Sequence, residues 1–290
     1  MSGVKRGGRG LNLYGQLPVW FHSDGPHGDV VISTRIRLAR NLEGRKFPSA
    51  ASSRDKQKIF NEAASVMCGV PKGLFGSEFE LVKFGRLRKL EQQFLIEERL
   101  VSVDLLRAQG ERGVASENSR RVSVMINEED HLRLQGMGSG FRTFEIWEKI
   151  DLLDDYIGSR LKYAYDGRLG FLTSCPTNCG TGLRLSCLMH LPGLVLTKSI
   201  DAVLQGASQM GCATRGFFGE NSEIVGNFFQ ISNQATMGAH EREFIESTEK
   251  VIREVVSHER KSRERLLRDA RLELSDKVFR SLGILSNARM

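Results

Sequence analysis

The sequence predicts an α+β fold, in which helices cover a sheet, and three observations lead to this prediction. Short segments rich in β-branched residues recur along the chain, as is typical of strands. Amphipathic stretches of helical length lie between them. These strands and helices do not alternate regularly, which disfavours a doubly wound parallel sheet. A chain of 290 residues with 40% hydrophobic content can bury a core of ordinary size.

The expected elements can be placed in order along the chain. Residues 1–14 form a glycine-rich, basic segment, which we expect to be a flexible tail because it offers little to bury. Strands are predicted at residues 30–37, 122–126, 169–173 and 228–231, and helices at residues 53–67 and 144–161. From Glu241 onward, apolar residues recur at helical spacing among charged ones, so residues 241–290 are expected to be a helical C-terminal region.

Composition narrows the classes of function. No stretch approaches the roughly 18 to 20 apolar residues of a membrane helix, and the N-terminus lacks an apolar export segment, so we expect a cytoplasmic protein. The five cysteines contain no CxxC pair, which signals neither a disulfide framework nor a zinc site. The net charge of +7 is compatible with nucleic acid, acidic lipid, a small polyanion such as a nucleotide, or a plain solvated surface. Charge alone does not decide among these.

A pair of arginines on the first predicted strand is the first candidate for chemistry. Because strand side chains alternate with a period of two, Arg35 and Arg37 share one face, roughly 7 Å apart. That separation suits neighbouring phosphates of a nucleotide. The alternative is a solvated arginine face on an edge strand.

Three consecutive acids follow the strand at residues 122–126. Glu128, Glu129 and Asp130 are costly to crowd together unless something cationic binds there, such as a metal, water-bridged magnesium or a guanidinium. The alternative is an acidic turn that caps a following helix, and His131 alone is more often structural than catalytic.

A loop rich in Gly, Thr and Asn follows the strand predicted at residues 169–173. We expect an apolar helix after this loop, with Arg184 near its start, so that backbone N–H groups and the helix end can meet an anion. The alternative is an ordinary helix-capping loop in which Cys175 is a buried thiol.

A fourth motif spans residues 214–220. Glycines on both sides of Phe217 and Phe218 suggest a mobile loop that closes and carries Arg215 and Glu220 into a site. The alternative is a hairpin loop whose two phenylalanines pack in the core. The familiar nucleotide-binding motifs GxxxxGK[ST], HRD and GxGxxG after a strand are absent from the sequence.

Taken in order, the segments STRIRLAR, NEEDHLR, CPTNCGTGLR and TRGFFGE resemble the signature set of the phosphagen kinases, the family of creatine and arginine kinases. The resemblance covers about residues 15–240. The phrases VVISTRIRLARN and SENSRRVSVMINEEDHLR resemble the protein arginine kinase branch of the McsB type, which phosphorylates arginine side chains in proteins. The resemblance implies a guanido phosphotransferase catalytic domain with an antiparallel sheet flanked by helices, close to that of glutamine synthetase.

The resemblance also implies roles for individual residues. The implied catalytic residues are Glu129 and Glu220, with Cys175 as the reactive cysteine beside the guanidino group. Glu128 and Asn178 would lie on the substrate side. The ATP-binding residues would be Ser33, Arg35, Arg37, Arg133, Arg184 and Arg215. Mg²⁺ would accompany ATP, held mainly by the nucleotide phosphates and water, with Glu128 and Asp130 as outer-shell partners and without a protein metal site.

The chemistry of the acceptor agrees with these residue types. A guanidinium with a pKa above about 12 is a poor nucleophile until its charge is localised and a proton is removed. Two carboxylates can grip it in forked geometry while arginines and Mg²⁺ neutralise the transferring group. The expected function is therefore transfer of the γ-phosphoryl group of ATP to arginine side chains in proteins. The alternatives are a phosphagen kinase for free arginine or another small guanidino compound, and a catalytically silent arginine-binding adaptor.

Departures from the family pattern shape the expected partners. Fewer than thirty residues precede Val30, where small-molecule phosphagen kinases carry a helical domain, so we expect a more open acceptor pocket that favours arginine on a protein chain. Leu188 stands where many family members have an adenine-facing histidine. The sequence up to Met290 resembles only the beginning of the family's C-terminal region, so the resemblance leaves phosphoarginine-dependent regulation and family-type dimerisation open. The partners implied are ATP and proteins with exposed arginine, among them a transcriptional repressor or protease clients, and a homodimer; a membrane is excluded and nucleic acid is disfavoured.

Overall fold

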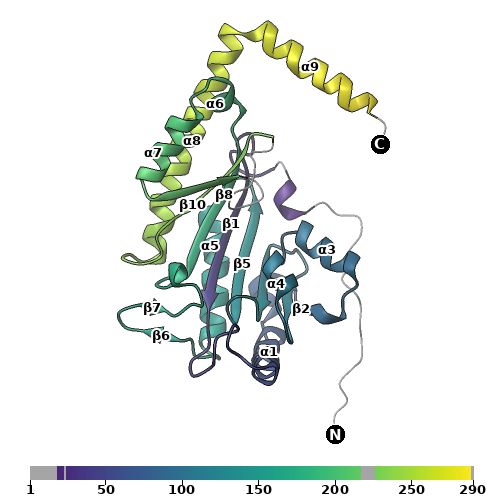
Figure 1. The fold of residues 1–290 in the computed structure, drawn as a ribbon, viewed down its shortest axis with the longest axis vertical. Helices are drawn as coiled ribbons and strands as arrows, with labels where there is room; N and C mark the ends of the chain where they lie inside the picture. Colours follow the sequence, from purple (N-terminus) through teal and green to yellow (C-terminus); the bar gives the residue numbers. More distant parts are fainter. Residues whose placement is uncertain (1–17, 23, 217–225, 289–290) are drawn as a thin grey trace. The chain divides into compact units, whose positions relative to one another are not determined.

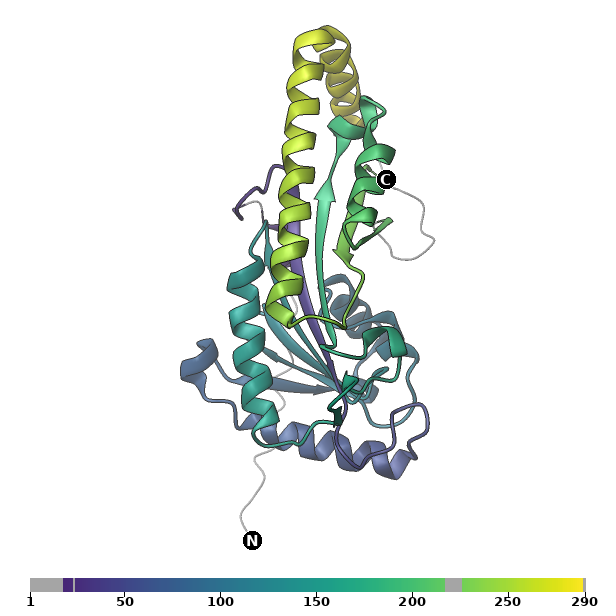
Figure 2. The ribbon, with the colours of Figure 1, turned by 90° about the vertical axis from the view of Figure 1, so that its left-hand side faces the viewer.

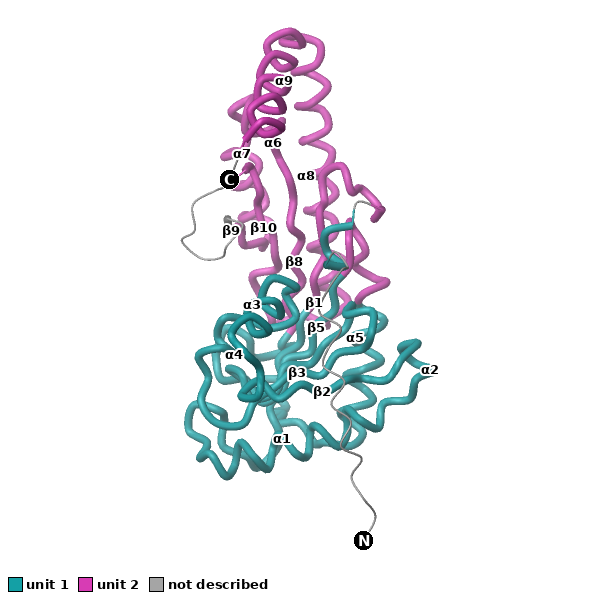
Figure 3. The backbone as a smooth tube through the Cα atoms, turned by 90° about the vertical axis from the view of Figure 1, so that its right-hand side faces the viewer, with its two compact units in different colours: residues 1–22, 37–137, 147–182 teal, residues 23–36, 138–146, 183–290 magenta. Residues whose placement is uncertain are grey.

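The computed structural model describes residues 18–22, 24–216 and 226–288, and the chain divides into two compact units (Figure 3). Unit 1 comprises residues 1–22, 37–137 and 147–182, and unit 2 comprises residues 23–36, 138–146 and 183–290. The tail expected at residues 1–14 lies outside the described residues.

Unit 1 contains antiparallel strands in the order β2, β3, β4, β5 and β1, of which Figure 1 labels β2, β5 and β1. The strands are β2 (Phe79–Lys83), β3 (Gly113–Glu117), β4 (Val122–Ile126), β5 (Leu132–Ser139) and β1 (Val31–Arg40), of which residues 31–36 and 138–139 belong to unit 2. The helices of this part of the chain are α1 (Ser53–Cys68), α2 (Lys72–Phe75), α3 (Lys89–Glu97), α4 (Val103–Arg107) and most of α5 (Thr143–Gly158). A small hairpin joins β6 (Tyr165–Asp166) to β7 (Gly170–Phe171).

Local sequence signals explain where α1 begins and which side it buries. Ser52 caps the helix by accepting a hydrogen bond from the Asp55 amide, and the Asp55 carboxylate accepts one in return from the Ser52 amide. The buried side chains of α1 are Ile59, Phe60, Ala63 and Met67, at the spacing of one helix face. The sequence prediction of a helix at residues 53–67 is confirmed.

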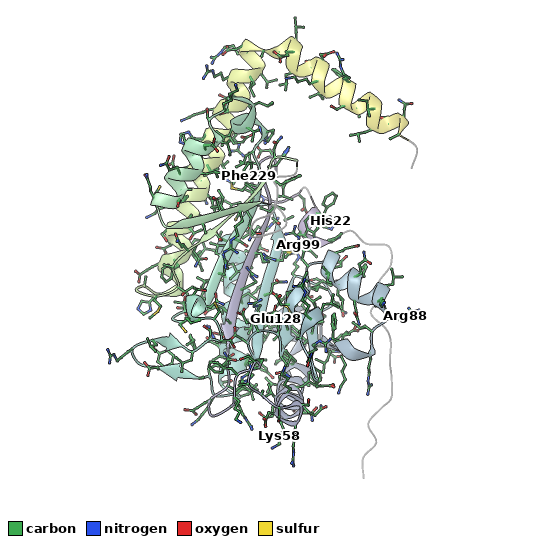
Figure 4. All side chains as sticks on the ribbon, in the orientation of Figure 1. His22, Lys58, Arg88, Arg99, Glu128 and Phe229 are labelled. Carbon is green, nitrogen blue, oxygen red and sulfur yellow. The ribbon has the colours of Figure 1, made fainter. Side chains whose placement is uncertain are left out.

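Unit 2 contains the strand order β1, β8 (Leu183–His190), β10 (Phe228–Asn233) and β9 (Cys212–Gly216). Its helices are α6 (Pro192–Leu196), α7 (Ile200–Gln209), α8 (Glu241–Asp269) and α9 (Arg271–Asn287). Figure 2 shows α8 running along the strands of this unit. Val251 and Ile252 of α8 belong to one hydrophobic core with Ile231 and Phe229 of β10, the latter labelled in Figure 4. One face of the unit 2 strands is thereby covered by apolar side chains.

The other expected elements are confirmed in part. Strands β1, β4 and β10 and helices α5 and α8 occupy the places predicted from residue patterns. Only Gly170–Phe171 of the strand expected at residues 169–173 forms a strand. No helix in the described part of the chain is long and apolar enough to cross a membrane.

For the candidate motifs, one expectation is wrong and one of the alternatives is excluded. The apolar helix expected after the loop at residues 176–182 is the strand β8, so Arg184 lies on a strand and no helix end meets an anion there. β8 is largely buried on both of its faces, so its sequence LRLSCLMH lacks the strict apolar–polar alternation of a half-buried strand and resembles a buried helix. The acidic motif does not cap a helix either, because strand β5 follows it directly.

A fully buried glutamate fastens α6 to α8 within unit 2. The two carboxylate oxygens of Glu259 accept hydrogen bonds from the amides of Gly193 and Leu194, both at 2.9 Å. Arg263, one turn further along α8, donates from Nε to the same carboxylate at 2.6 Å. The carboxylate therefore satisfies two amides at the start of α6 that have no partner inside that helix.

Replacing Glu259 by Ala should lower the free energy of unfolding by about 2 to 4 kcal/mol, because the buried amides of Gly193 and Leu194 both lose their charged acceptor. Chemical denaturation followed by circular dichroism measures this loss. Glu254→Ala, at an exposed position of the same helix, is the matched control and should change the stability by less than about 0.5 kcal/mol. Similar stabilities for both variants would contradict this account of Glu259.

Candidate active site

The three acids lie in a five-residue turn that joins β4 to β5 in unit 1. Asn127 has φ of +57°, in the left-handed region that asparagine tolerates, and its amide donates to the carbonyl of His131 at 2.9 Å. The His131 ring is buried, accepts at Nδ1 from the Leu42 amide at 3.0 Å, and therefore donates from Nε2 to the Lys46 carbonyl at 2.9 Å. Burial lowers the pKa of His131, so the ring is a neutral structural element of the turn.

The carboxylate of Asp130 connects this turn to the cysteine loop. Asp130 is fully buried, and its Oδ1 accepts from the Asn41 side-chain amide at 2.6 Å and from the Ser174 backbone amide at 2.7 Å. The Ser174 hydroxyl in turn donates to the backbone carbonyl of Glu129 at 2.7 Å. The two motifs that the sequence places 44 residues apart are thus held together by hydrogen bonds within unit 1.

Arg133 forms ion pairs with two of the three acids. Its Nη1 donates to Glu128 Oε1 at 2.8 Å, and its Nη2 donates to Glu129 Oε2 at 2.9 Å. Glu128, labelled in Figure 4, is buried and accepts a second hydrogen bond at Oε1 from the hydroxyl of Ser102, whereas the side chain of Glu129 keeps 40% of its surface exposed. Glu128 is therefore the fixed member of the pair and Glu129 the accessible one.

The pKa of Glu129 is raised above the ordinary value of a glutamate. Burial is the largest cause, and the negative charges of Asp130, Glu128 and Asp104 add to it, while Arg133 acts in the opposite direction. A carboxylate with a raised pKa is better matched to accepting a proton than an ordinary surface glutamate.

The cysteine loop follows from Ser174. Cys175 is partly exposed, with its Sγ 3.0 Å from the hydroxyl of Thr177, and its backbone carbonyl accepts from the Asn178 amide at 3.0 Å. This bond closes a short 3₁₀ turn over Pro176–Asn178, so Cys175 and Asn178 are carried on one small, internally bonded loop.

Two residues that support this part of unit 1 were missed by the sequence analysis. Ser102 caps α4 and donates to Glu128. The buried Arg40 donates to Asp154 Oδ2 at 2.7 Å and to the carbonyl of Thr181 at 2.8 Å, which fixes the far end of the cysteine loop. The sequence did contain one signal for Arg40. Strand side chains alternate between two faces, so Arg40 lies on the face opposite to that of Arg35 and Arg37.

Unit 2 gathers several predicted arginines on the face of its strands that is turned away from the α8 core. Thr34 and Cys187 contact each other on the core side, so the neighbouring Arg35 and the Arg184 three residues before Cys187 point to the opposite face. Arg215 is paired across the ladder with Gln230, and Gln230 with Leu188, which places Arg215 on that same face. Ser33 is buried on the same strand as Arg35.

The predicted residues are therefore distributed over both units. Unit 1 holds Arg37, Glu128, Glu129, Arg133, Cys175 and Asn178, and unit 2 holds Ser33, Arg35, Arg184 and Arg215. Glu220 and the aromatic pair before it lie outside the described residues. Within the described ranges, no group of three or more His, Cys, Asp or Glu side chains is arranged to hold a metal ion.

A comparison with known protein families decides the classification. The profile described as ATP:guanido phosphotransferase, C-terminal catalytic domain, matches residues 63–262. The chain belongs to the ATP:guanido phosphotransferase family. The strand and loop segments that carry Glu128, Glu129, Arg133, Cys175, Arg184 and Arg215 all fall within the matched range.

Within the ATP:guanido phosphotransferase family, the chain is similar to bacterial protein-arginine kinases. It is 42% identical over 274 residues to the protein-arginine kinase of Bacillus licheniformis, covering 94% of this chain and 75% of that one. It is 41% identical over 274 residues to the protein-arginine kinase of Geobacillus stearothermophilus, with the same coverage. The predicted resemblance to this branch of the family is confirmed.

Solved structures of ATP:guanido phosphotransferases confirm the α+β fold. Lombricine kinase superposes with a TM-score of 0.71 at 23% identity, covering 87% of this chain and 70% of that one. The duplicated taurocyamine kinase from Schistosoma mansoni superposes with a TM-score of 0.71 at 24% identity, covering 80% of this chain and 33% of that one. At these identities the likeness shows the fold alone.

Replacing Asp130 by Ala should release the cysteine loop, because the Ser174 amide loses its acceptor. Hydrogen bonds to charged groups contribute about 1.5 to 3 kcal/mol, so amide exchange in residues 173–179 should accelerate roughly tenfold or more. Hydrogen exchange followed by mass spectrometry measures this rate. Glu129→Ala is the matched control, since Ser174 contacts only the backbone of Glu129. Unchanged exchange in the Asp130 variant would show that the loop holds its conformation without this carboxylate.

Proposed function

We propose that the chain is a protein-arginine kinase, which transfers the γ-phosphoryl group of ATP to the guanidino groups of arginine side chains in proteins. The observation that carries the proposal is the accessible Glu129, with its raised pKa, on a turn that is hydrogen-bonded to the loop of Cys175. Membership of the family and the similarity to protein-arginine kinases support it. We further propose residues 15–240 as the catalytic region and 241–290 as its C-terminal extension.

The acceptor side of the proposed reaction lies in unit 1. An arginine guanidinium would donate to the Glu129 carboxylate, which localises its charge and accepts a proton as the phosphoryl group arrives. Cys175 and Asn178 are proposed to contact the guanidino group from the neighbouring loop, with Glu128 holding Arg133 beside it. Glu220 is proposed as the second catalytic carboxylate on the resemblance of its motif alone.

The phosphate side of the proposed reaction depends on arginines. Arg35 of β1, Arg184 of β8 and Arg215 of β9 point to the same face of the strands of unit 2. A guanidinium group can bind phosphate oxygens with two parallel hydrogen bonds. Arg37, Arg133 and Ser33 complete the proposed ATP-binding set. Since phosphoryl transfer is accelerated mainly by positioning and charge neutralisation, such an array suits a transferring phosphoryl group.

Mg²⁺ is proposed to accompany ATP. The residues present fit a hydrated ion, because two buried carboxylate oxygens, Glu128 Oε2 and Asp130 Oδ2, accept no hydrogen bond from the described residues. They would hold the ion through water, while the nucleotide phosphates supply its direct ligands. The ion would neutralise charge on the phosphates.

Proteins with exposed arginine are the proposed acceptors, and a transcriptional repressor or protease clients are proposed as examples. The proposed place of action is the cytoplasm, and a homodimer is the proposed assembly. Free arginine as the acceptor and a silent arginine-binding adaptor are the two functions against which the proposal is tested.

Incubation with Mg-ATP and an unfolded protein should produce acid-labile phosphate on arginine, detected by mass spectrometry under non-acidic handling. Glu129→Gln should reduce the rate by about 100- to 1000-fold, as expected for loss of one preorganised electrostatic contact. Phosphoserine alone would refute the proposal. Turnover with free arginine but not with protein would favour a small-molecule kinase, and client binding without turnover would favour an adaptor.

The pH dependence of kcat/KM should report the raised pKa of Glu129. The carboxylate must be deprotonated to accept a proton, so activity should fall as the pH drops through this pKa, at a higher pH than for an ordinary glutamate. Asp104→Asn removes a negative charge that raises this pKa, so the acidic limb of the profile should move to lower pH. Glu97→Gln, an exposed glutamate of α3, is the control and should leave the limb in place. Superimposable profiles for the Asp104 variant and the wild type would contradict the assignment of the limb to Glu129.

A further inference from the structure

The hairpin of β6 and β7 presents two large apolar side chains to solvent in unit 1. Tyr165 is 62% exposed and Leu169 is 49% exposed. Between them, the Asp166 carboxylate accepts from the amides of Arg168 and Leu169 at 2.8 and 3.0 Å. The tip is therefore shaped by its own hydrogen bonds, and its apolar side chains are displayed by a defined turn.

The hairpin is anchored to unit 1 through Phe171. The Phe171 ring packs edge-on against Tyr165 at 5.3 Å and Tyr163 at 5.8 Å between ring centroids. The buried guanidinium of Arg40 lies 3.6 Å from the Phe171 centroid, and Arg40 is itself held by Asp154. Because this base is fixed, the exposure of Tyr165 and Leu169 belongs to the folded hairpin.

The same strand that anchors the hairpin also joins it to the cysteine loop. The Phe171 amide donates to the Gly180 carbonyl at 2.7 Å, and the Gly180 amide donates back to the Phe171 carbonyl at 3.3 Å. Gly170 has φ of +73°, and a Cβ there would lie 2.5 Å from the Gly180 carbonyl oxygen, so the two segments meet as closely as backbones can. The hairpin and the loop of Cys175 and Asn178 thus form one continuous part of unit 1.

We propose that this hairpin is a docking surface for the polypeptide that flanks the target arginine. The inference rests on the proposed function and adds a substrate class to it, namely extended, unfolded segments with apolar residues near the arginine. An extended chain advances about 3.3 Å per residue, so residues three to six positions from the arginine lie about 10 to 20 Å away from it. Those residues can reach the hairpin while the arginine occupies the neighbouring loop.

The chemistry of the surface favours an apolar segment over a charged one. Covering exposed Tyr and Leu side chains with apolar atoms is favourable, and folded proteins rarely expose large contiguous apolar patches that could cover both side chains at once. The tip carries one acid, Asp166, and one base, Arg168, so it has no net charge that would select acidic or basic partners. Unfolded chains, by contrast, expose the apolar residues that this surface can bind.

The test compares the double variant Tyr165→Ser/Leu169→Ser with the wild type on two substrates. These are a reduced and alkylated, permanently unfolded protein and the tripeptide Gly-Arg-Gly. For the unfolded protein we expect kcat/KM to fall about tenfold, mainly because KM rises, since the variant lacks two apolar side chains that would contact the substrate. For the tripeptide, which is too short to reach the hairpin, we expect no change.

The matched control is Phe21→Ser/Leu90→Ser, which removes an aromatic and a leucine side chain of unit 1 with 58% and 64% exposure. This variant should leave both rates unchanged. An equal loss on both substrates, or no loss on the unfolded protein, would overturn the proposal. So would sedimentation showing that the wild type self-associates through the hairpin and the variant does not.

Binding of the fluorescently labelled unfolded protein, measured by anisotropy, separates this inference from the proposed function. A tenfold weaker Kd for the hairpin variant supports docking whether or not phosphate is transferred. If the wild type binds but phosphorylates neither substrate, the proposed function fails and the docking surface stands. Equal Kd values for variant and wild type would overturn the docking surface even if the kinase activity is present.

Discussion

The buried carboxylate of Asp130 is the interaction on which the candidate site of unit 1 depends. Burying a charge is costly unless hydrogen bonds compensate it, and Asn41 and Ser174 supply two such bonds from distant parts of the chain. Satisfying this one group therefore fixes the end of β1, the acidic turn and the cysteine loop against each other. The positions of Glu129 and Cys175 follow from this arrangement, because Glu129 directly precedes Asp130 and Cys175 directly follows Ser174, which the carboxylate holds.

The side chains proposed to bind phosphate and those proposed to act on the acceptor are positioned in different ways in the two units. In unit 2 the strands bury one face against α8, and the pleat then directs Arg35, Arg184 and Arg215 to the other face without any further specification. In unit 1 the functional side chains sit on turns, where each position has to be fixed by individual hydrogen bonds. The shared face of the arginines proposed to bind phosphate thus follows from strand periodicity, whereas the orientation of the acids requires individual hydrogen bonds.

Much of the fold was predictable because its signals are local. The β-branched run of β1, the apolar run of β4 and the capped, amphipathic α1 each carry their conformation in neighbouring residues. β8 was predicted incorrectly because it is buried on both faces, so periodicity could not separate strand from helix. The contacts of Ser102 with Glu128 and of Arg40 with Asp154 join residues 26 and 114 positions apart, and no local pattern encodes such pairs. The order of the motifs along the sequence identified the candidate acids and arginines, but the residues that support them could be identified only from the structure.

The difference between the two adjacent glutamates is the last step in assigning roles within the acidic turn. Glu128 is buried, and its Oε1 is committed to both Arg133 and Ser102. Glu129 shares only one bond with the same arginine, remains partly exposed, and has a raised pKa. A group that must exchange protons with a substrate needs access and a pKa near the working range, whereas a group that orients an arginine needs neither. The environments of the two carboxylates therefore support the proposal that Glu129 meets the substrate and that Glu128 positions Arg133.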